Sequence, residues 1–151
     1  SSDVCSSDLA YSDENSFEDE PGLIGYPSKV KYLVDCFGPT DLSLLNTSDL
    51  NYDLSNIFSS IDDIDKTKKM YNPINYVNKD IPNTLIIHGK ADELVPYESS
   101  VMLYDKCQKE NAKSELILLD FSSHDFSGIS KDDIISFSTG LLKFIILNSP
   151  L

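Results

Sequence analysis

The sequence has no arginine, no tryptophan and no long apolar run. All 12 basic residues are lysines, and 25 acidic residues bring the formal net charge to −13 at pH 7. Phosphate binding needs clustered positive charge and is best served by guanidinium groups, so this composition disfavours a nucleic-acid partner. The longest apolar runs, Leu85–Ile87 and Phe144–Leu147, are far shorter than the roughly 20 residues of a membrane-spanning helix, so we expect no membrane span.

Cysteine, histidine and glycine are also scarce, and their spacing disfavours several kinds of site. The three cysteines form no C-x-x-C pair, and only two histidines could join them as metal ligands. A disulfide framework or a structural zinc site is therefore disfavoured. None of the six glycines stands in a G-x-G-x-x-G or G-x-x-x-x-G-K-[ST] motif, which argues against dinucleotide and P-loop sites. The sequence thus implies no cofactor and no metal.

The acidic residues are spread unevenly along the chain. Residues 1–22 hold seven of them, together with six serines and no lysine. Such a stretch has too little apolar surface to offset the entropy lost on ordering. We therefore expect residues 1–22 to be a disordered or non-native acidic head, and residues 23–151 to form the globular part.

Apolar patterning in the globular part predicts alternating strands and helices. A β-branched and aromatic run closed by Gly-Pro, and two short apolar runs, are typical of strands. Ser130 and Asp133 have the spacing of a capping box at the start of a helix. Alternation of this kind indicates an α/β fold with a mostly parallel sheet flanked by helices. The expected strands are Lys29–Phe37, Thr84–Ile87 and Leu116–Leu119, and the expected helices are Glu98–Glu110, with Val101, Tyr104 and Cys107 as its apolar stripe, and Ser130–Ile145, with Ile134, Phe137, Leu141, Phe144 and Ile145.

Polar side chains follow the expected strands in the loops where a parallel sheet places its functional groups. One such loop carries Asp92, and the next carries His124, 32 residues later. An acid and an imidazole from neighbouring strand ends have the arrangement in which a carboxylate orients the ring and stabilises its charged form.

The segment from Lys29 to Ile145 resembles the C-terminal half of an α/β-hydrolase of the esterase/lipase group, which includes prolyl-oligopeptidase-like enzymes and feruloyl or acetylxylan esterases. The resemblance rests on four blocks in the right order: VDCFGPTDLS, YNPINYVNKDIPNTLIIHG, GKADELVPYESSVMLYDKC and the terminal histidine loop. It implies that Asp92, in an HG-x-x-D-x-x-VP loop, is the acid of a catalytic triad and that His124 is its base.

The sequence departs from this family in two places. Gly usually follows the catalytic His, whereas Asp125 follows His124, so we expect Asp125 either to alter the loop backbone or to hydrogen-bond the ring. No G-x-S-x-G elbow occurs, so the sequence supplies no nucleophile and no oxyanion-hole donors. The resemblance therefore implies a serine hydrolase of carboxylic esters that lacks its N-terminal half and is inactive as this chain alone.

Plainer and alternative interpretations stay open. Asp92 could be an ordinary turn residue and His124 a surface histidine, while His88 is expected to fix the turn through a hydrogen bond. A His88–His124 metal site would need ligands that the spacing does not supply. The alternative functions are a peptidase of the prolyl-oligopeptidase type and a non-catalytic binding protein. The sequence gives no localisation, and we interpret Ser122, Ser123, Glu93 and Asp41 as polar loop or capping residues.

Overall fold

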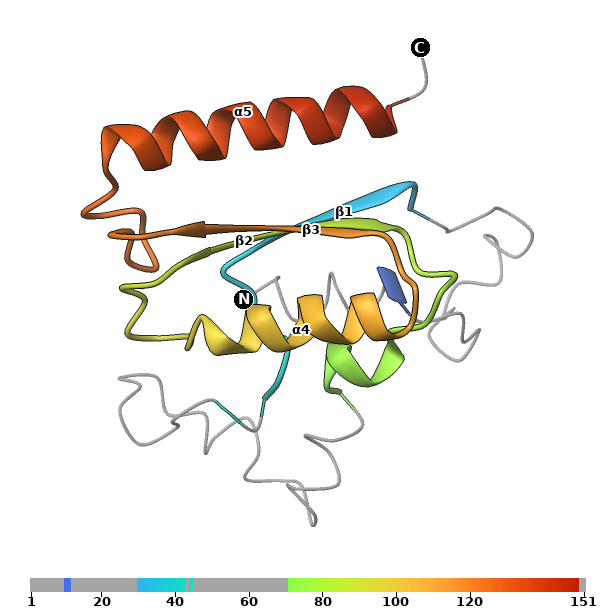
Figure 1. Cartoon of the computed structure of the whole chain (residues 1–151). Coiled ribbons are helices and arrows are strands. Elements are labelled where there is room, and N and C mark those ends of the chain that lie inside the picture. The colour runs from blue at the N-terminus through green and yellow to red at the C-terminus, as the bar shows by residue number, and fades with distance from the viewer. Residues whose placement is uncertain (1–9, 12–29, 43, 45–70, 150–151) are drawn as a thin grey trace, which may run out of the picture.

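The structure is a computed structural model that describes residues 10–11, 30–42, 44 and 71–149. These residues form a three-stranded parallel sheet in the order β1-β2-β3, with a helix layer on each face (Figure 1). The α/β class and the order of strands and helices are as predicted. The elements are β1 (Tyr32–Cys36), the 3-10 helix η3 (Pro73–Tyr76), β2 (Asn83–Gly89), α4 (Glu98–Lys109), β3 (Ser114–Leu119) and α5 (Lys131–Asn148).

The central strand β2 is buried on both faces. It follows Pro82, pairs in parallel with β1 and β3, and every residue after Asn83 is buried. A near-continuous apolar run is typical of a parallel strand covered by helices on both sides. Ile86 faces the cluster that includes Leu103 and Cys107 of α4, whereas Leu85 and Ile87 face the cluster that includes Phe144 of α5.

Helix α4 lies under the sheet with η3, and its buried face differs from the predicted stripe. Cys107 is buried as expected, but Val101 and Tyr104 are only half-buried, and Leu103 takes the central place. Two serines in the first turn, Ser99 and Ser100, are buried as well. Hydropathy did not predict their burial, because serine is hydrophilic. In the structure their hydroxyls have hydrogen-bond partners inside the protein.

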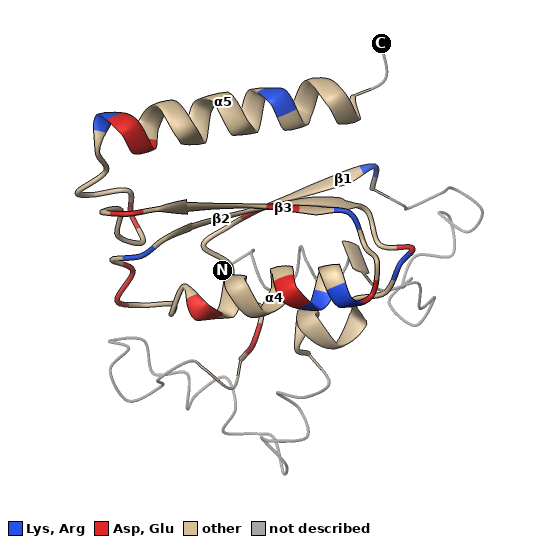
Figure 2. Ribbon diagram, viewed as in Figure 1, with Lys and Arg blue, Asp and Glu red and all other residues tan. Residues whose placement is uncertain are grey.

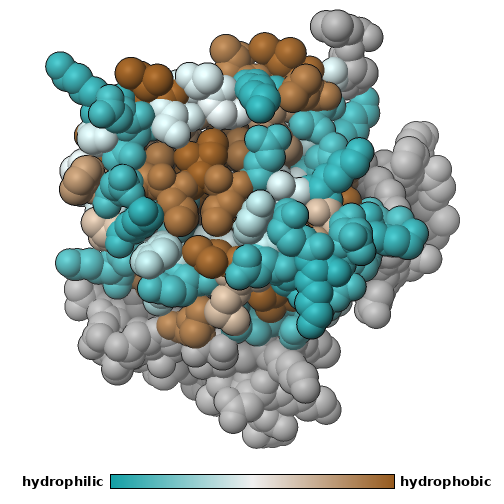
Figure 3. All heavy atoms as spheres, viewed as in Figure 1, coloured by the Kyte–Doolittle hydropathy of each residue, from teal (hydrophilic) through white to brown (hydrophobic). Residues whose placement is uncertain are grey.

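Helix α5 covers the opposite face of the sheet and begins with the predicted capping box of Ser130 and Asp133. Of its expected stripe, Phe144 is buried and Phe137 and Leu141 pack against the same cluster, but Ile134 is exposed. The helix carries few charges beyond its first turn (Figure 2). Apolar side chains gather over α5 and along the adjoining sheet edge (Figure 3). The most exposed apolar side chains of α5 are Ile135, Leu142, Ile146 and Leu147.

The predicted acidic head falls largely outside the described residues. Only Ala10 and Tyr11 of the acidic head are described, and Tyr11 is buried in the α4-side cluster, where its hydroxyl donates to Thr84 Oγ1 at 3.2 Å. Burial raises the pKa of Tyr11 well above its ordinary value. The division at residue 22 stays a prediction. No helix in the described part of the chain is both long and apolar enough to cross a membrane.

Candidate active site

Asp92 lies in a tight turn directly after β2, which we call the acid loop (Gly89–Val95). The turn closes through a backbone hydrogen bond from Asp92 N to Gly89 O of 3.2 Å. The Oδ1 atom of Asp92 accepts the backbone amides of Leu94 and Val95, each at 2.9 Å. These bonds satisfy the loop's own amides and hold the carboxylate, whose side chain has no exposed surface. Glu93, beside it, is exposed as expected for a solvated charge.

The other carboxylate oxygen of Asp92 accepts two imidazole N–H groups. Oδ2 lies 3.1 Å from His88 Nε2 and 2.8 Å from His124 Nδ1. Burial by itself raises the pKa of Asp92, but hydrogen bonds from His88, Val95, His124 and Leu94 outweigh it and lower the pKa to about 2. The carboxylate is therefore ionised at neutral pH, and four donors occupy its acceptor sites.

His124 lies in the loop after β3, which we call the base loop (Asp120–Ile129). Its Nδ1 faces only the carboxylate, which cannot donate, so Nδ1 carries the proton in the neutral ring. Nε2 is then the unprotonated nitrogen, and it has no hydrogen-bond partner among the described residues. The side chain of His124 is 38% exposed. The structure thus brings Asp92 and His124 together in the orientation that leaves a basic nitrogen accessible.

The two loops meet because Gly89 permits close contact between them. A Cβ atom at Gly89 would overlap the carbonyl oxygen of Ser122. The backbone amides that follow it, of Lys90 and Ala91, donate to Leu119 O at 2.8 Å and Ser122 O at 3.1 Å. Glycine here therefore sets the distance across which Asp92 reaches His124.

The base loop is held mainly by its own residues. The Oδ1 atom of Asp125 accepts Ser123 Oγ at 2.7 Å and Ser127 N at 2.9 Å. Hydrogen bonds from Ser127, which have the largest effect, and from Ser123 keep the pKa of Asp125 well below its ordinary value. Of the two expectations for Asp125, the structure supports the effect on the loop. Phe126, next to it, has a φ of 63°, a left-handed conformation that disfavours non-glycine residues by roughly 1–2 kcal/mol.

Two side chains that the sequence analysis did not single out support this pair. Phe37, at the carboxyl end of β1, is buried, and its ring centroid lies 5.3 Å from that of His88 and 5.9 Å from that of His124. Ser100 places its Oγ 2.7 Å from His88 Nδ1. The signal for Phe37 was present, since it is an aromatic residue at a strand end. A serine within an expected helix gave no such signal.

The remaining polar candidates have hydrogen-bond partners away from the Asp92–His124 pair. Ser122 is buried and donates to Ser123 O at 3.1 Å, and Ser123 Oγ bonds within the base loop. Asp41 Oδ1 accepts a hydrogen bond from Asn72 Nδ2 at 2.9 Å. This bond connects the sequence blocks VDCFGPTDLS and YNPINYVNKDIPNTLIIHG. The hydrogen bond predicted to fix the turn through His88 is confirmed, since its Nε2 also lies 3.0 Å from Val95 O. Among the described residues, no group of three or more potential ligands could hold a metal ion.

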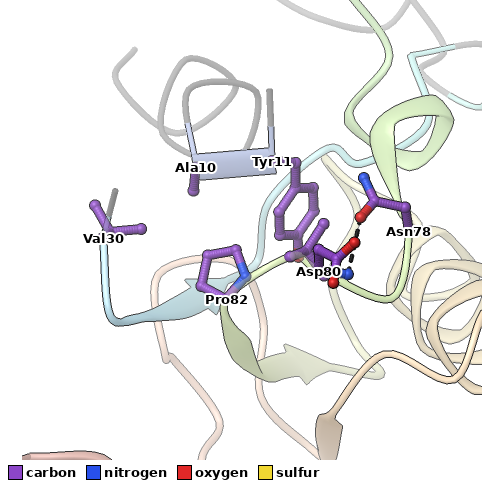
Figure 4. A pocket seen from close by; sticks show the side chains of 7 residues that line it. Ala10, Tyr11, Val30, Asn78, Asp80 and Pro82 are labelled. Atoms are coloured by element: carbon purple, nitrogen blue, oxygen red, sulfur yellow. Dashed lines mark hydrogen bonds between the residues drawn. The ribbon is translucent and has the colours of Figure 1, made fainter. Parts of the chain in front are cut away.

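A small cavity of about 60 Å³ (Figure 4) is lined by none of these residues. It borders Val30 and Pro82, which precede β1 and β2, whereas Asp92 and His124 follow the carboxyl ends of their strands. Pockets for organic ligands commonly have roughly 300 Å³ or more, so this cavity is too small to hold an ester substrate. It is lined by Ala10, Tyr11, Val30, Asn78, Asp80, Ile81 and Pro82.

Comparisons with known proteins agree with this architecture. A family model described as BD-FAE matches residues 8–107, a range that includes Asp92 and ends before His124. A solved structure described as a truncated carbohydrate esterase from gut microbiota is 28% identical, with a TM-score of 0.61 over 77% of this chain and 43% of that chain. A comparison with curated protein sequences finds no match.

Two further solved structures show the same fold at lower identity. The propionate-bound esterase Est2 of Thermogutta terrifontis is 17% identical, with a TM-score of 0.62 over 98% of this chain and 53% of that chain. The carboxylesterase Cest-2923 of Lactobacillus plantarum WCFS1 is 10% identical, with a TM-score of 0.69 over 98% of this chain and 56% of that chain. The chain spans about half the length of each of these three solved structures.

Proposed function

Because the chain belongs to the BD-FAE family, an α/β-hydrolase-type family, we propose that its parent protein is a serine hydrolase of carboxylic esters, of the esterase/lipase type. Asp92 is the acid and His124 is the general base. The observation that carries this proposal is the 2.8 Å hydrogen bond between His124 Nδ1 and Asp92 Oδ2, with Nε2 left accessible. A carbohydrate esterase among the similar structures makes acyl esters of sugars a substrate class to test first.

In the proposed mechanism a serine attacks the ester carbonyl, and His124 Nε2 takes its proton. The imidazolium that forms then donates this proton to the leaving alcohol. Asp92, ionised and fixed by its four donors, keeps Nδ1 protonated and stabilises the imidazolium without taking the proton itself. The ester C–O bond breaks, and the acyl group stays on the serine oxygen. A water molecule, deprotonated by the same Nε2, then attacks this acyl-enzyme; the acyl–serine bond breaks, the carboxylic acid leaves, and Nε2 returns the proton to the serine oxygen.

The nucleophile of this mechanism does not belong to the present sequence, which has no G-x-S-x-G elbow. We propose that residues 23–151 are the C-terminal part of a catalytic domain whose other half supplies the serine and the oxyanion hole. The match to about half of each of the three esterase structures described above supports this division. The chain of 151 residues alone then has an acid and a base without a nucleophile, and does not turn over esters.

The test compares the chain with the longer protein read from the DNA upstream of the globular part, residues 23–151. With a p-nitrophenyl acyl ester, the 151-residue chain should hydrolyse no faster than its His124→Ala variant. The longer protein should contain the elbow and hydrolyse the ester, and His124→Ala should lower its kcat/KM by about 10³-fold or more. Clear hydrolysis by the short chain, or an unaffected His124→Ala variant of the long one, would contradict the proposal. Cleavage of a peptide anilide instead of the ester would indicate a peptidase.

A further inference from the structure

His88 is a buried histidine whose two ring nitrogens both have partners. It is the last residue but one of β2, and its side chain has no exposed surface. Nδ1 lies 2.7 Å from Ser100 Oγ, while Nε2 lies 3.1 Å from Asp92 Oδ2 and 3.0 Å from Val95 O. The ring thus connects the start of α4 to the carboxylate that His124 contacts.

The partners of His88 determine where its proton lies. A carboxylate and a carbonyl oxygen can only accept, so Nε2 carries the proton. In the neutral ring Nδ1 must then accept, and the Ser100 hydroxyl donates to it. His124 has the opposite arrangement, with its proton on Nδ1, so the two histidines present N–H groups to the same oxygen of Asp92.

These two donors differ in how firmly they are held. The ring of His88 is enclosed and bonded on both sides, whereas His124 is 38% exposed and bonded through Nδ1 alone. The amides of Leu94 and Val95 fix Oδ1, so His88 is the one rigid donor that fixes Oδ2 among the described residues.

We propose that His88 is a positioning residue: its Nε2–H group, oriented by Ser100, holds Asp92 Oδ2 where it receives the Nδ1–H group of His124. The role of the pair in ester hydrolysis rests on the proposed function, but the positioning does not. The simpler alternative is that His88 only holds the turn through Val95 O. In that case its removal would lower stability and leave the proton of His124 on Nδ1.

Nitrogen NMR of the ring atoms separates the two interpretations in the full 151-residue chain. The sequence has only two histidines. Spectra that correlate the imidazole nitrogens with the carbon-bound ring protons therefore contain signals from only two rings. At a pH where both rings are neutral, we expect His124 protonated on Nδ1 and His88 on Nε2. His88→Leu has no N–H group to hold Asp92 Oδ2. In this variant the nitrogen chemical shifts of His124 should move toward the values given by the tautomer mixture of a free imidazole.

Two further comparisons control for loss of folding. His88→Gln keeps an N–H group near the position of Nε2 and should restore the wild-type shifts of His124. Ser100→Ala should move them in the same direction as His88→Leu but less, whereas Ser99→Ala should not. Ser99 is an adjacent buried serine whose Oγ bonds Thr40 instead. If His88→Leu does not fold, the Ser100→Ala and Ser99→Ala pair decides.

The proposal is overturned if His124 keeps its Nδ1 proton in a folded His88→Leu variant. It is also overturned if Ser100→Ala has no more effect than Ser99→Ala. None of these measurements uses ester turnover. If the longer protein fails to hydrolyse esters, the proposed function is wrong, but the NMR result on positioning still stands. If the longer protein hydrolyses esters and the NMR shifts do not change as expected, only the role of His88 is wrong.

Discussion

The acid loop and the base loop meet at one hydrogen bond but are built in opposite ways. The acid loop buries its carboxylate and gives it four donors, two from its own backbone and two from histidines. The base loop exposes its imidazole, bonds it once, and holds Phe126 in a left-handed conformation. In the proposed mechanism Asp92 only orients its partner and gains from being fixed in advance, whereas His124 passes a proton between two oxygens and must reach both.

The largest effect is expected from Asp92→Asn, which breaks the acid loop at its centre. The amide NH₂ would face the Nε2–H group of His88, which cannot become an acceptor while it also bonds Val95 O. Loss of a buried charged hydrogen-bond acceptor should lower the free energy of unfolding by about 2–3 kcal/mol at pH 7, measured by urea denaturation. Asp105→Asn, at an exposed position of α4, is the matched control and should change it little.

The difference in stability between the wild type and Asp92→Asn depends on pH, in a direction that follows from the pKa of Asp92 in the wild type. This pKa is about 2 in the folded protein, below the ordinary 3.8, so folding favours the ionised carboxylate. The corresponding contribution, about 2 kcal/mol, is complete above about pH 5 and is lost as the pH falls through 2, with about half gone by pH 3. The stability difference between wild type and Asp92→Asn should therefore narrow on acidification. A difference that stays constant from pH 6 to pH 3 would contradict this account.

A smaller effect is expected where the two loops touch. Gly89→Ala places a methyl group on the carbonyl oxygen of Ser122, which belongs to backbone and can move only with the loop. We expect a loss of about 1–3 kcal/mol in urea denaturation, together with loss of the Nδ1 proton signal of His124. Gly140→Ala is the control, since its methyl group would meet only the flexible end of the Ile117 side chain. Equal effects of the two variants would show that loop contact is not the cause.

Features that have a local signal, or that follow from the topology of the sheet, could be predicted from the sequence. The Gly-Pro after Phe37, the two short apolar runs and the Ser130–Asp133 box are local signals, so the strand and helix order followed from them. The proximity of Asp92 and His124 followed from topology, because carboxyl ends of neighbouring parallel strands meet at one edge. Their catalytic role stays a prediction.

Other features depend on packing between distant residues, which local patterns do not encode. Ser100 contacts His88 only because α4 returns against the end of β2, and Phe37 reaches both histidines from a backbone φ of 60°. The exposure of Ile134 has a similar origin. Periodicity shows which residues share a helix face, but it does not show how much of that face the sheet covers.

The smallest effect is expected within the base loop, from Asp125→Gly. This change restores the residue that usually follows the histidine in the family, but removes the acceptor of Ser123 Oγ and Ser127 N. Exchange of the Ser127 amide with solvent should speed up several-fold, with little change in global stability and none at Leu94 and Val95, because the acid loop has its own hydrogen bonds. Asp125→Asn keeps an acceptor oxygen and should change the exchange less. If acid-loop amides accelerated equally, the two loops would open as one unit, and the contrast between a firmly held acid loop and a separately held base loop would be wrong.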